Sequence, residues 1–260
     1  MTGLSGMTGL TLTDVYDELY ARRDPEAEVA RIHPLLASTG GGPGRLLDIG
    51  CGTGRHAPAW CARGIRVTGV DTDTAAIATA KARAAALSPR PEYHAGTVAD
   101  LPADGFDAAT ALFHVVNYLP DVVALVETLR AVRSRLVDGA PFVFDAWNGI
   151  AALLDPPRVK DDEAVGAGGR RITVRTSPSL DRMAQTVTLV MQGTVVEPDG
   201  TARSFESRYE HRLWMPRELA EVAEFCGFRR PGIVPADGRT GPADETCWKI
   251  LFTTTARAER

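Results

Sequence analysis

Residues 46–56 read Leu46-Leu47-Asp48-Ile49-Gly50-Cys51-Gly52-Thr53-Gly54-Arg55-His56. The apolar run is typical of a strand that is covered on both faces, with Asp48 as a carboxylate inside it. The three alternating glycines predict a tight turn into a helix, and because glycine has no Cβ, such a backbone can approach a ligand closely. We therefore expect a nucleoside cofactor at this turn.

A second landmark helps to define the cofactor. Val67-Thr68-Gly69-Val70-Asp71 reads as the next strand and ends in an acid. An acid about 20 residues beyond a glycine turn accepts hydrogen bonds from ribose hydroxyls. Asp71 alone does not distinguish a dinucleotide from S-adenosylmethionine. The dinucleotide pattern G-x-G-x-x-G, however, needs a third glycine where Arg55 or His56 stands, so the spacing disfavours a pyrophosphate.

The run from Leu47 through Gly54 resembles the hydrophobic-Asp-hydrophobic-Gly-x-Gly-x-Gly turn of the class I S-adenosylmethionine-dependent methyltransferases. The resemblance continues through Asp71 and residues 96–102 and 106–119, and it covers most of the chain. It implies an α/β, Rossmann-like methyltransferase fold, with a mostly parallel seven-stranded sheet and helices on both faces. It also implies S-adenosyl-L-methionine as cofactor, S-adenosyl-L-homocysteine as product and a small-molecule acceptor as partner.

The resemblance further implies which residues bind the cofactor. The glycine turn contacts its methionine part, Asp71 its ribose, and the loop after the third strand flanks its adenine. The predicted set is Tyr20, Asp48, Gly50, Cys51, Gly52, Gly54, Asp71, Thr72, Thr97, Val98 and Phe113. The family usually has Gly-Asp at the start of the third loop, whereas this chain has Gly96-Thr97, so Asp100 is a second candidate for the acid near adenine.

Composition excludes several classes of protein. The 260 residues carry a formal net charge of -4, and the basic residues are dispersed, which disfavours nucleic acid as a partner. The four cysteines, at positions 51, 61, 226 and 247, lack the paired spacing of a zinc site and are expected to be reduced. No run resembles a signal peptide or a membrane span, so we expect a cytoplasmic protein with no metal and no membrane association.

Four segments are expected along the chain. A helix from Val15 to about Leu36 carries Tyr16 and Tyr20 on one face. From Arg45 onward, strands alternate with helices, as in a parallel sheet covered on both sides. The predicted division is 1–43 for an N-terminal helix or lid with linker, 44–150 for the cofactor-binding core, 151–214 for a linker and β insertion, and 215–260 for the C-terminal helix and strands that complete the sheet.

The insertion precedes the last helix, which is expected over residues 216–226. Pro156-Pro157 and the charged residues Lys160 to Glu163 are interpreted as a linker or lid. Alternation of apolar and polar residues then predicts three antiparallel strands, near residues 171–176, 184–196 and 204–213. Such a small antiparallel sheet can roof a substrate pocket or form a dimer interface, so a homodimer stays open.

Ligands of an open parallel sheet bind beyond the carboxyl ends of its strands. The chemistry is therefore expected in the loops that follow the fourth and fifth strands. The predicted catalytic residues are His114, Tyr118 and Asp145, with His114 as a base or merely a hydrogen-bonding group. The predicted substrate-binding residues are Tyr16, Asn117, Trp147, Asn148 and His211.

Alternative structural roles accompany several of these residues. The tyrosines of the first helix can pack against the sheet instead of closing over the ligands. Trp147 can be buried, with Asp145 capping a turn. His211 can be an exposed strand residue, and Arg208 and Arg212 solvated ones.

The residues from Leu112 to Leu119 are loosely similar to those of enzymes that methylate deoxyaminosugars and antibiotic precursors. The histidine proposed as catalytic in the aminosugar enzymes falls on Tyr118 here, so that assignment does not transfer intact. We expect N-methylation of the amine of a sugar or secondary metabolite. The alternatives are O-methylation of a sugar or phenolic hydroxyl with His114 as base, and a non-catalytic cofactor-binding subunit.

Overall fold

The computed structural model describes residues 9–37, 42–103 and 105–258. The chain divides into two compact units. The core unit comprises Pro25–Ala152 and Trp214–Arg260, and the insertion unit comprises Met1–Asp24 and Leu153–Leu213. Each unit has its own sheet and its own hydrophobic core.

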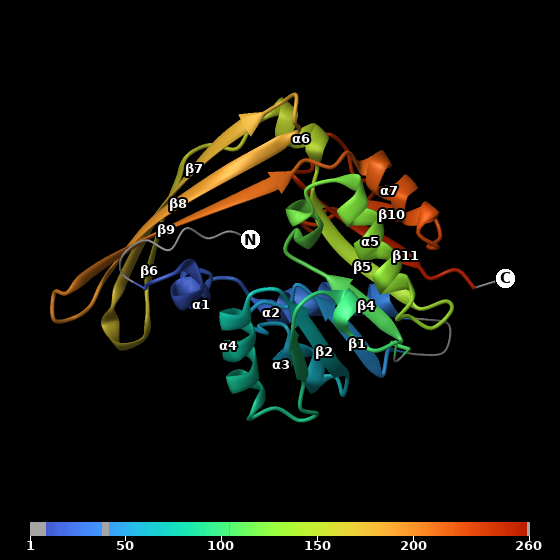
Figure 1. Ribbon diagram of the computed structural model, residues 1–260, viewed down its shortest axis with the longest axis horizontal. Coiled ribbons are helices and arrows are strands. Elements are labelled where there is room, and N and C mark those ends of the chain that lie inside the picture. The colour runs from blue at the N-terminus through green and yellow to red at the C-terminus, as the bar shows by residue number, and fades with distance from the viewer. Residues whose placement is uncertain (1–8, 38–41, 104, 259–260) are drawn as a thin grey trace. The chain divides into compact units, whose positions relative to one another are not determined.

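The core unit contains a seven-stranded sheet in the order β10-β11-β5-β4-β1-β2-β3 (Figure 1). Neighbours among β1 to β5 run parallel, whereas β11 is antiparallel to both β5 and β10. This sheet and the separate antiparallel insertion confirm the predicted fold class. The strands of the core unit are β1 Arg45–Ile49, β2 Arg66–Asp71, β3 Glu92–Ala95, β4 Ala108–Ala111, β5 Pro141–Trp147, β10 Gly232–Pro235 and β11 Lys249–Thr255.

Helices cover both faces of this sheet, as the alternation predicts. Asp73 and Asp121 cap α4 and α5 by accepting hydrogen bonds from main-chain N–H groups of the first turn. The short helix α6 was not predicted from the sequence. The helices and 3₁₀ turns are α2 Pro25–Ile32, η2 His33–Leu36, α3 Ala57–Ala62, α4 Thr74–Ala84, η3 Val98–Asp100, η4 Val115–Tyr118, α5 Val122–Arg133, α6 Gly149–Leu154 and α7 Pro216–Phe225.

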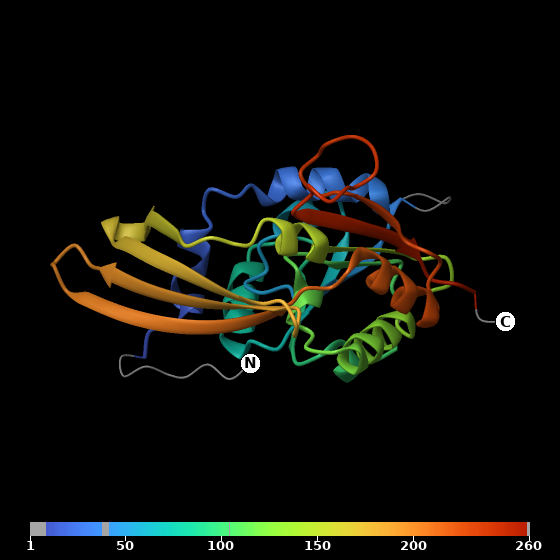
Figure 2. The ribbon, with the colours of Figure 1, turned by 90° about the horizontal axis from the view of Figure 1, so that it is seen from above.

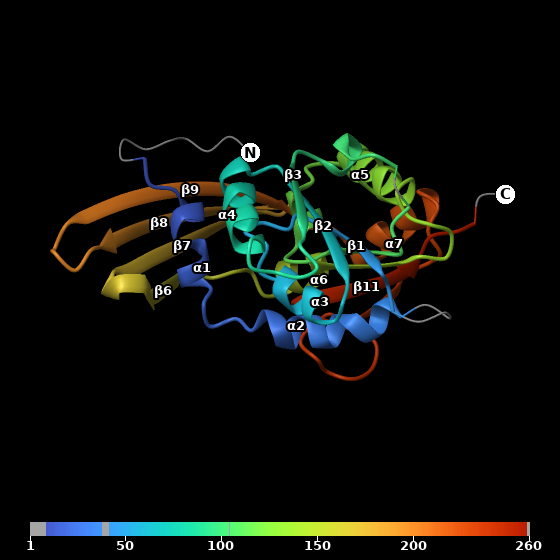
Figure 3. The same ribbon diagram turned by 90° about the horizontal axis from the view of Figure 1, so that it is seen from below.

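The alternation of β5 divides the core into two layers. Phe142 and Phe144 pack with α5 and α7, which lie side by side in Figure 2. Val143 points to the other face and packs with α2 and α3, visible together in Figure 3. Because side chains two positions apart in a strand share a face, Asp145 and Trp147 continue the row of Val143 to the carboxyl end of β5.

The insertion unit is built on a four-stranded antiparallel sheet in the order β6-β7-β8-β9. The N-terminal segment packs against this sheet: Leu12 and Val15 join Ile172, Val174 and other apolar residues in one buried cluster. Its elements are η1 Leu12–Val15, α1 Tyr16–Leu19, β6 Lys160–Val165, η5 Ala167–Gly169, β7 Arg171–Asp181, β8 Thr186–Val196 and β9 Ala202–Arg212.

Two sequence predictions about these segments are wrong. The first helix is not continuous from Val15 to Leu36, because α1 ends at Leu19 and Pro25 begins a new helix, α2. Proline suits the first position of a helix, where its missing N–H would have no intrahelical partner. The charged residues Lys160 to Glu163 are not a linker or lid but belong to β6, which pairs with β7. Charges are typical of a strand at the edge of a sheet, where they discourage further pairing.

Two kinds of feature are absent from the described residues. None of their helices is both long and apolar enough to cross a bilayer. Within the same residues, no three or more histidine, cysteine, aspartate or glutamate side chains form a group that could hold a metal ion.

Candidate functional site

The glycine turn between β1 and α3 has one open side. Gly50, Gly52 and Gly54 all have positive φ angles, of 65°, 53° and 72°. A Cβ at Gly50 would lie 2.4 Å from Val115, and one at Gly54 would lie 2.5 Å from the Tyr93 hydroxyl. A Cβ at Gly52 would meet no protein atom within 4 Å. Packing therefore accounts for the outer two glycines, whereas Gly52 leaves a space that a ligand can enter.

Asp71, at the end of β2, is fixed beside this space. Its Oδ2 accepts a hydrogen bond of 2.8 Å from the Gly52 main-chain N–H, and its Oδ1 accepts one of 2.9 Å from Asp73 N–H. Burial raises the pKa of Asp71, and these main-chain hydrogen bonds oppose the rise. Thr72 follows directly. The carboxylate is thus oriented toward the glycine backbone, where ligand hydroxyls can donate to it.

Asp48 and Cys51 lie beneath the turn. Asp48 is only 3% exposed and accepts a 2.9 Å hydrogen bond from the Thr110 hydroxyl, which ties β1 to β4. Burial raises the pKa of Asp48, with His56 acting in the opposite direction. Burial likewise raises the pKa of the Cys51 thiol far above its usual range. These contacts support the turn from within the protein.

The loop after β3 is organised by Asp100. Its Oδ2 accepts hydrogen bonds from both the main-chain N–H and the hydroxyl of Thr97, at 2.7 and 2.9 Å. Both hydrogen bonds lower the pKa of Asp100. Val98 is buried in the core. Thr97 and Asp100, the two candidates for the group near adenine, therefore act together in one exposed turn.

The segment that follows β4 has a strained backbone and is hydrogen-bonded to β5. Phe113 and His114 both adopt left-handed backbone conformations, with φ of 75° and 58°, which cost about 1–3 kcal/mol each in a residue with a side chain. The His114 main-chain N–H donates a 2.6 Å hydrogen bond to Asp145 Oδ1. The ring Nδ1 lies 3.4 Å from Asp145 Oδ2. A histidine and a carboxylate from neighbouring strands thus form a pair.

The charge of Asp145 is maintained despite its burial. Burial would raise the pKa of Asp145, but hydrogen bonds from His114 and the positive charges of His114 and Lys249 outweigh it, so the pKa lies below its usual range. Asp145 is therefore an ionised acceptor that can orient the imidazole and stabilise its protonated form.

Aromatic rings surround this pair. The His114 ring centroid lies 5.8 Å from that of Phe113 and 5.7 Å from that of Trp147. Asn117 is fully buried, and its Oδ1 accepts a 3.0 Å hydrogen bond from Trp147 N–H, which fixes η4 against β5. Tyr118 follows with 41% of its surface exposed. The structure therefore brings together the predicted residues of the two strand exits.

Asn148 has a structural role. Its Nδ2 donates a 3.0 Å hydrogen bond to the Asp244 carbonyl, and its Oδ1 accepts one of 3.1 Å from Ile150 N–H in the first turn of α6. Both ends of this buried amide are therefore used within the protein, so Asn148 is not carried into the proposal below.

The remaining predicted residues belong to the insertion unit. Tyr16 and Tyr20 have ring centroids 4.7 Å apart, and Tyr16 packs against that unit's core. Burial raises the pKa of Tyr20, with further contributions from Asp162 and Tyr209. His211 on β9 is only 3% exposed, so its interpretation as an exposed strand residue is wrong. Roles for Tyr16, Tyr20 and His211 toward ligands stay predictions.

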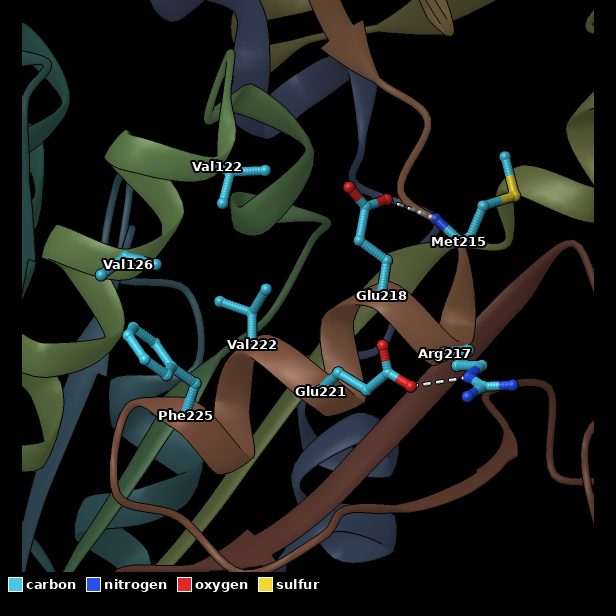
Figure 4. A pocket seen from close by; sticks show the side chains of 8 residues that line it. All are labelled: Val122, Val126, Met215, Arg217, Glu218, Glu221, Val222 and Phe225. Atoms are coloured by element: carbon cyan, nitrogen blue, oxygen red, sulfur yellow. Dashed lines mark hydrogen bonds and ion pairs between the residues drawn. The ribbon is translucent and has the colours of Figure 1, made fainter.

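A shallow apolar groove lies elsewhere in the core unit, between α5 and α7 (Figure 4). An ion pair between Arg217 and Glu221 borders it. Its lining includes no residue of the predicted site; the residues are Val122, Val126, Met215, Arg217, Glu218, Glu221, Val222 and Phe225.

Sequence reasoning missed two residues beside the histidine–carboxylate pair. The Trp248 ring centroid lies 5.6 Å from that of Trp147, and Lys249 pairs with Trp147 across the sheet. Lys249 begins the last strand, β11, and Trp248 directly precedes it. Their proximity depends on the register of β11 against β5, for which the sequence offers no local signal.

Comparison with known proteins agrees with this geometry. A family model described as a methyltransferase domain matches residues 46–139. A dTDP-4-amino-2,3,4,6-tetradeoxy-D-glucose N,N-dimethyltransferase from Saccharopolyspora spinosa is 27% identical over 83% of this chain and 84% of its own length. A ubiquinone biosynthesis O-methyltransferase from Alkalilimnicola ehrlichii is 29% identical over 72% of this chain and 85% of its own length.

The fold also matches solved structures. The sugar N-methyltransferase KedS8 from a Streptoalloteichus species superposes with a TM-score of 0.79 at 22% identity, and the match covers 99% of both chains. The matched domain includes the glycine turn, Asp71 and the segment after β4 that carries His114. Residues 46–139 therefore form a methyltransferase domain, and the chain is a methyltransferase that shares the fold of S-adenosylmethionine-dependent methyltransferases.

Proposed function

We propose that this enzyme methylates the amine of a small polar acceptor, a sugar or a related secondary metabolite. The observation that carries the proposal is the His114–Asp145 pair beside Trp147, which supplies a proton acceptor and an aromatic wall at the exits of β4 and β5. The aminosugar N,N-dimethyltransferase among the relatives supports an amine as the acceptor.

The residues present fit the cofactor. The open side of Gly52 receives its methionine part, and Asp71 accepts hydrogen bonds from its ribose. The Thr97–Val98 loop borders its adenine, with Phe113 as a further contact. When bound, S-adenosylmethionine supplies a methyl group on a sulfonium sulfur, so that the carbon–sulfur bond breaks as the acceptor attacks and the sulfur keeps the electron pair.

His114 handles the proton of the acceptor. A protonated amine lacks the lone pair needed for attack, so a base must first remove its proton, and histidine is the side chain most often used for this task. Nδ1 of His114 lies 3.4 Å from Asp145 Oδ2, so the carboxylate favours the tautomer that carries its proton on Nδ1 and leaves Nε2 as the base. Its negative charge then stabilises the imidazolium that forms, as in other histidine–carboxylate pairs.

The backbone strain at the β4 exit has a function in this scheme. The hydrogen bond from His114 N–H to Asp145 holds the left-handed conformation, and this conformation sets the direction of the imidazole. Asn117 fixes Trp147 through the main chain, and the Trp147 ring face can attract a cationic amine. Tyr118 lies at the exposed edge, where it can orient the acceptor.

A second candidate function is O-methylation of a sugar or phenolic hydroxyl. The same pair of residues can remove a hydroxyl proton during attack, and an O-methyltransferase is also among the relatives. The two functions differ in how strongly they need the base. A solution of higher pH supplies neutral amine without enzymatic help and, at about pH 10, also ionises a phenol, but it does not ionise a sugar hydroxyl, so the sugar acceptors distinguish the two functions.

The pH dependence of a His114→Ala variant tests this difference. Wild type and variant are assayed for S-adenosylhomocysteine release with amine acceptors, such as glucosamine and tyramine, and with their hydroxyl counterparts, glucose and tyrosol. For amine methylation, the kcat/KM of the variant falls by about 10²–10⁴-fold at pH 7 and recovers as pH rises through the acceptor's own pKa. His94→Ala, at an exposed position on β3, serves as a matched control.

Turnover only with hydroxyl acceptors would refute N-methylation and favour the second candidate. A His114→Ala variant whose kcat/KM matches wild type at every pH would instead show that His114 is not a base. S-adenosylhomocysteine binding, measured by calorimetry in each variant, verifies that the cofactor site is intact.

A further inference from the structure

The first residues of β11 lie beside the proposed reaction site. Lys249 is the register partner of Trp147 in the antiparallel pair β11–β5. Residues directly opposite each other in such a pair project to the same face of the sheet. Asp145, two positions before Trp147, shares this face. One face of the sheet thus presents Asp145, Trp147 and Lys249 in a row.

The charges in this row are of opposite sign and are differently exposed. Asp145 is mostly buried, with 14% of its side chain exposed, and is already paired with His114. Burial acts to raise its pKa, His114 lowers it most strongly, and Lys249 adds a smaller effect in the same direction. The Lys249 side chain is exposed. An exposed cationic side chain therefore lies at the same end and on the same face of the sheet as the buried carboxylate.

Trp248 adds a second aromatic ring. The Trp147 and Trp248 rings meet edge to face, with an interplanar angle of 75° and centroids 5.6 Å apart. Both residues are only partly buried. The Trp248 carbonyl accepts a 3.0 Å hydrogen bond from Asn148 N–H, which holds the two strand ends together. The result is a partly exposed aromatic corner with a cation next to it.

We propose that Trp147, Trp248 and Lys249 form an acceptor subsite for a ring that carries a carboxylate or a phosphate. The ring packs against the tryptophans, and the anion pairs with the Lys249 ammonium group. The charge of Asp145 repels the anion and attracts the amine. The opposite charges of Asp145 and Lys249 thus orient the acceptor, with its amine toward His114 and its anion toward Lys249.

This inference rests on the proposed function only in placing the acceptor at this end of the sheet. Calorimetric binding to the protein saturated with S-adenosylhomocysteine tests it without turnover. Two matched pairs of probes are used: glucosamine with glucosamine 6-phosphate, and tyramine with tyrosine. The first pair tests a phosphate and the second a carboxylate.

At least one anionic probe, glucosamine 6-phosphate or tyrosine, is expected to bind about tenfold or more tightly than the compound of its pair that lacks the anion. Lys249→Met removes the charge while keeping a long side chain, and it is expected to abolish this preference. Lys81→Met, at an exposed position on α4, is the control and is expected to retain it. Trp248→Phe is expected to weaken both members of the preferred pair. In turnover, Lys249→Met raises KM for the anionic acceptor and leaves kcat within about twofold.

Equal affinity for the two members of both pairs would overturn the subsite, as would a preference that survives Lys249→Met. Absence of binding by both anionic probes would overturn it as well. If an anionic probe binds through Lys249 but no amine is methylated, the subsite stands and only the proposed acceptor group is wrong.

Discussion

A methyl group at Gly52 provides a sharp test of the cofactor site. Gly52→Ala places a Cβ in the space that no protein atom occupies within 4 Å. The variant therefore has no steric reason to misfold, apart from its φ of 53°, which costs an alanine about 1–2 kcal/mol. The added methyl group would instead occupy the space that the cofactor needs.

Gly64→Ala is the matched control. Gly64 follows α3, has φ of 78° and has no atom within 4 Å of its Cβ position. Both variants should thus lose similar stability without ligand, with a Tm lower by about 2–8 °C. Only Gly52→Ala should impair the binding of S-adenosylhomocysteine.

The assay is thermal unfolding with and without S-adenosylhomocysteine at 100 times the wild-type Kd. Wild type and Gly64→Ala should gain about 2.7 kcal/mol from the ligand, a Tm increase of about 5–10 °C. A tenfold loss of affinity in Gly52→Ala reduces the gain to about 1.4 kcal/mol, half of the wild-type increase. A full ligand-induced shift in Gly52→Ala would refute the placement of the cofactor at this turn.

Three further predictions concern acidic residues. Asp71→Ala should weaken S-adenosylhomocysteine binding by about 1–3 kcal/mol, and unchanged calorimetric affinity would contradict its ribose contact. Because the pKa of Asp145 is lowered in the folded protein, its charge stabilises the protein above about pH 4. This stability is lost as pH falls further, so Asp145→Asn should show a weaker acid dependence in urea unfolding from pH 6 to 3. Glu18→Gln should cost about 1–2 kcal/mol by breaking its partly buried pair with Arg170, whereas Arg175→Gln, from an exposed pair, should stay within about 0.5 kcal/mol of wild type in the same unfolding assay.

The elements that carry local signals were predicted well from the sequence. The glycine turn after Ile49 and the acid at Asp71 specified a strand, a tight turn and the next strand. The helix α7 matched its expected range within one residue. Such features depend on backbone conformation and on apolar periodicity within a few residues, which a sequence displays directly.

Predictions that depended on distant contacts were less successful. The charges of β6 suggested a linker, because nothing in Lys160 to Glu163 shows that β7 lies alongside. The burial of His211 depends on the packing of β9 in its unit. Likewise, only the folded chain brings Asn148 to the Asp244 carbonyl, which accepts a hydrogen bond from its amide.

The amino-acid sequence alone was enough to predict the fold class and the glycine turn after β1, since glycine conformation and strand periodicity are local properties. Only the tertiary structure showed that Asp145 is the acceptor for His114, and that Trp248 and Lys249 flank Trp147. These partners are 31, 101 and 102 positions apart respectively in the chain. Strand order and register decide such contacts, because they minimise the free energy of the whole sheet and leave no mark on any single segment.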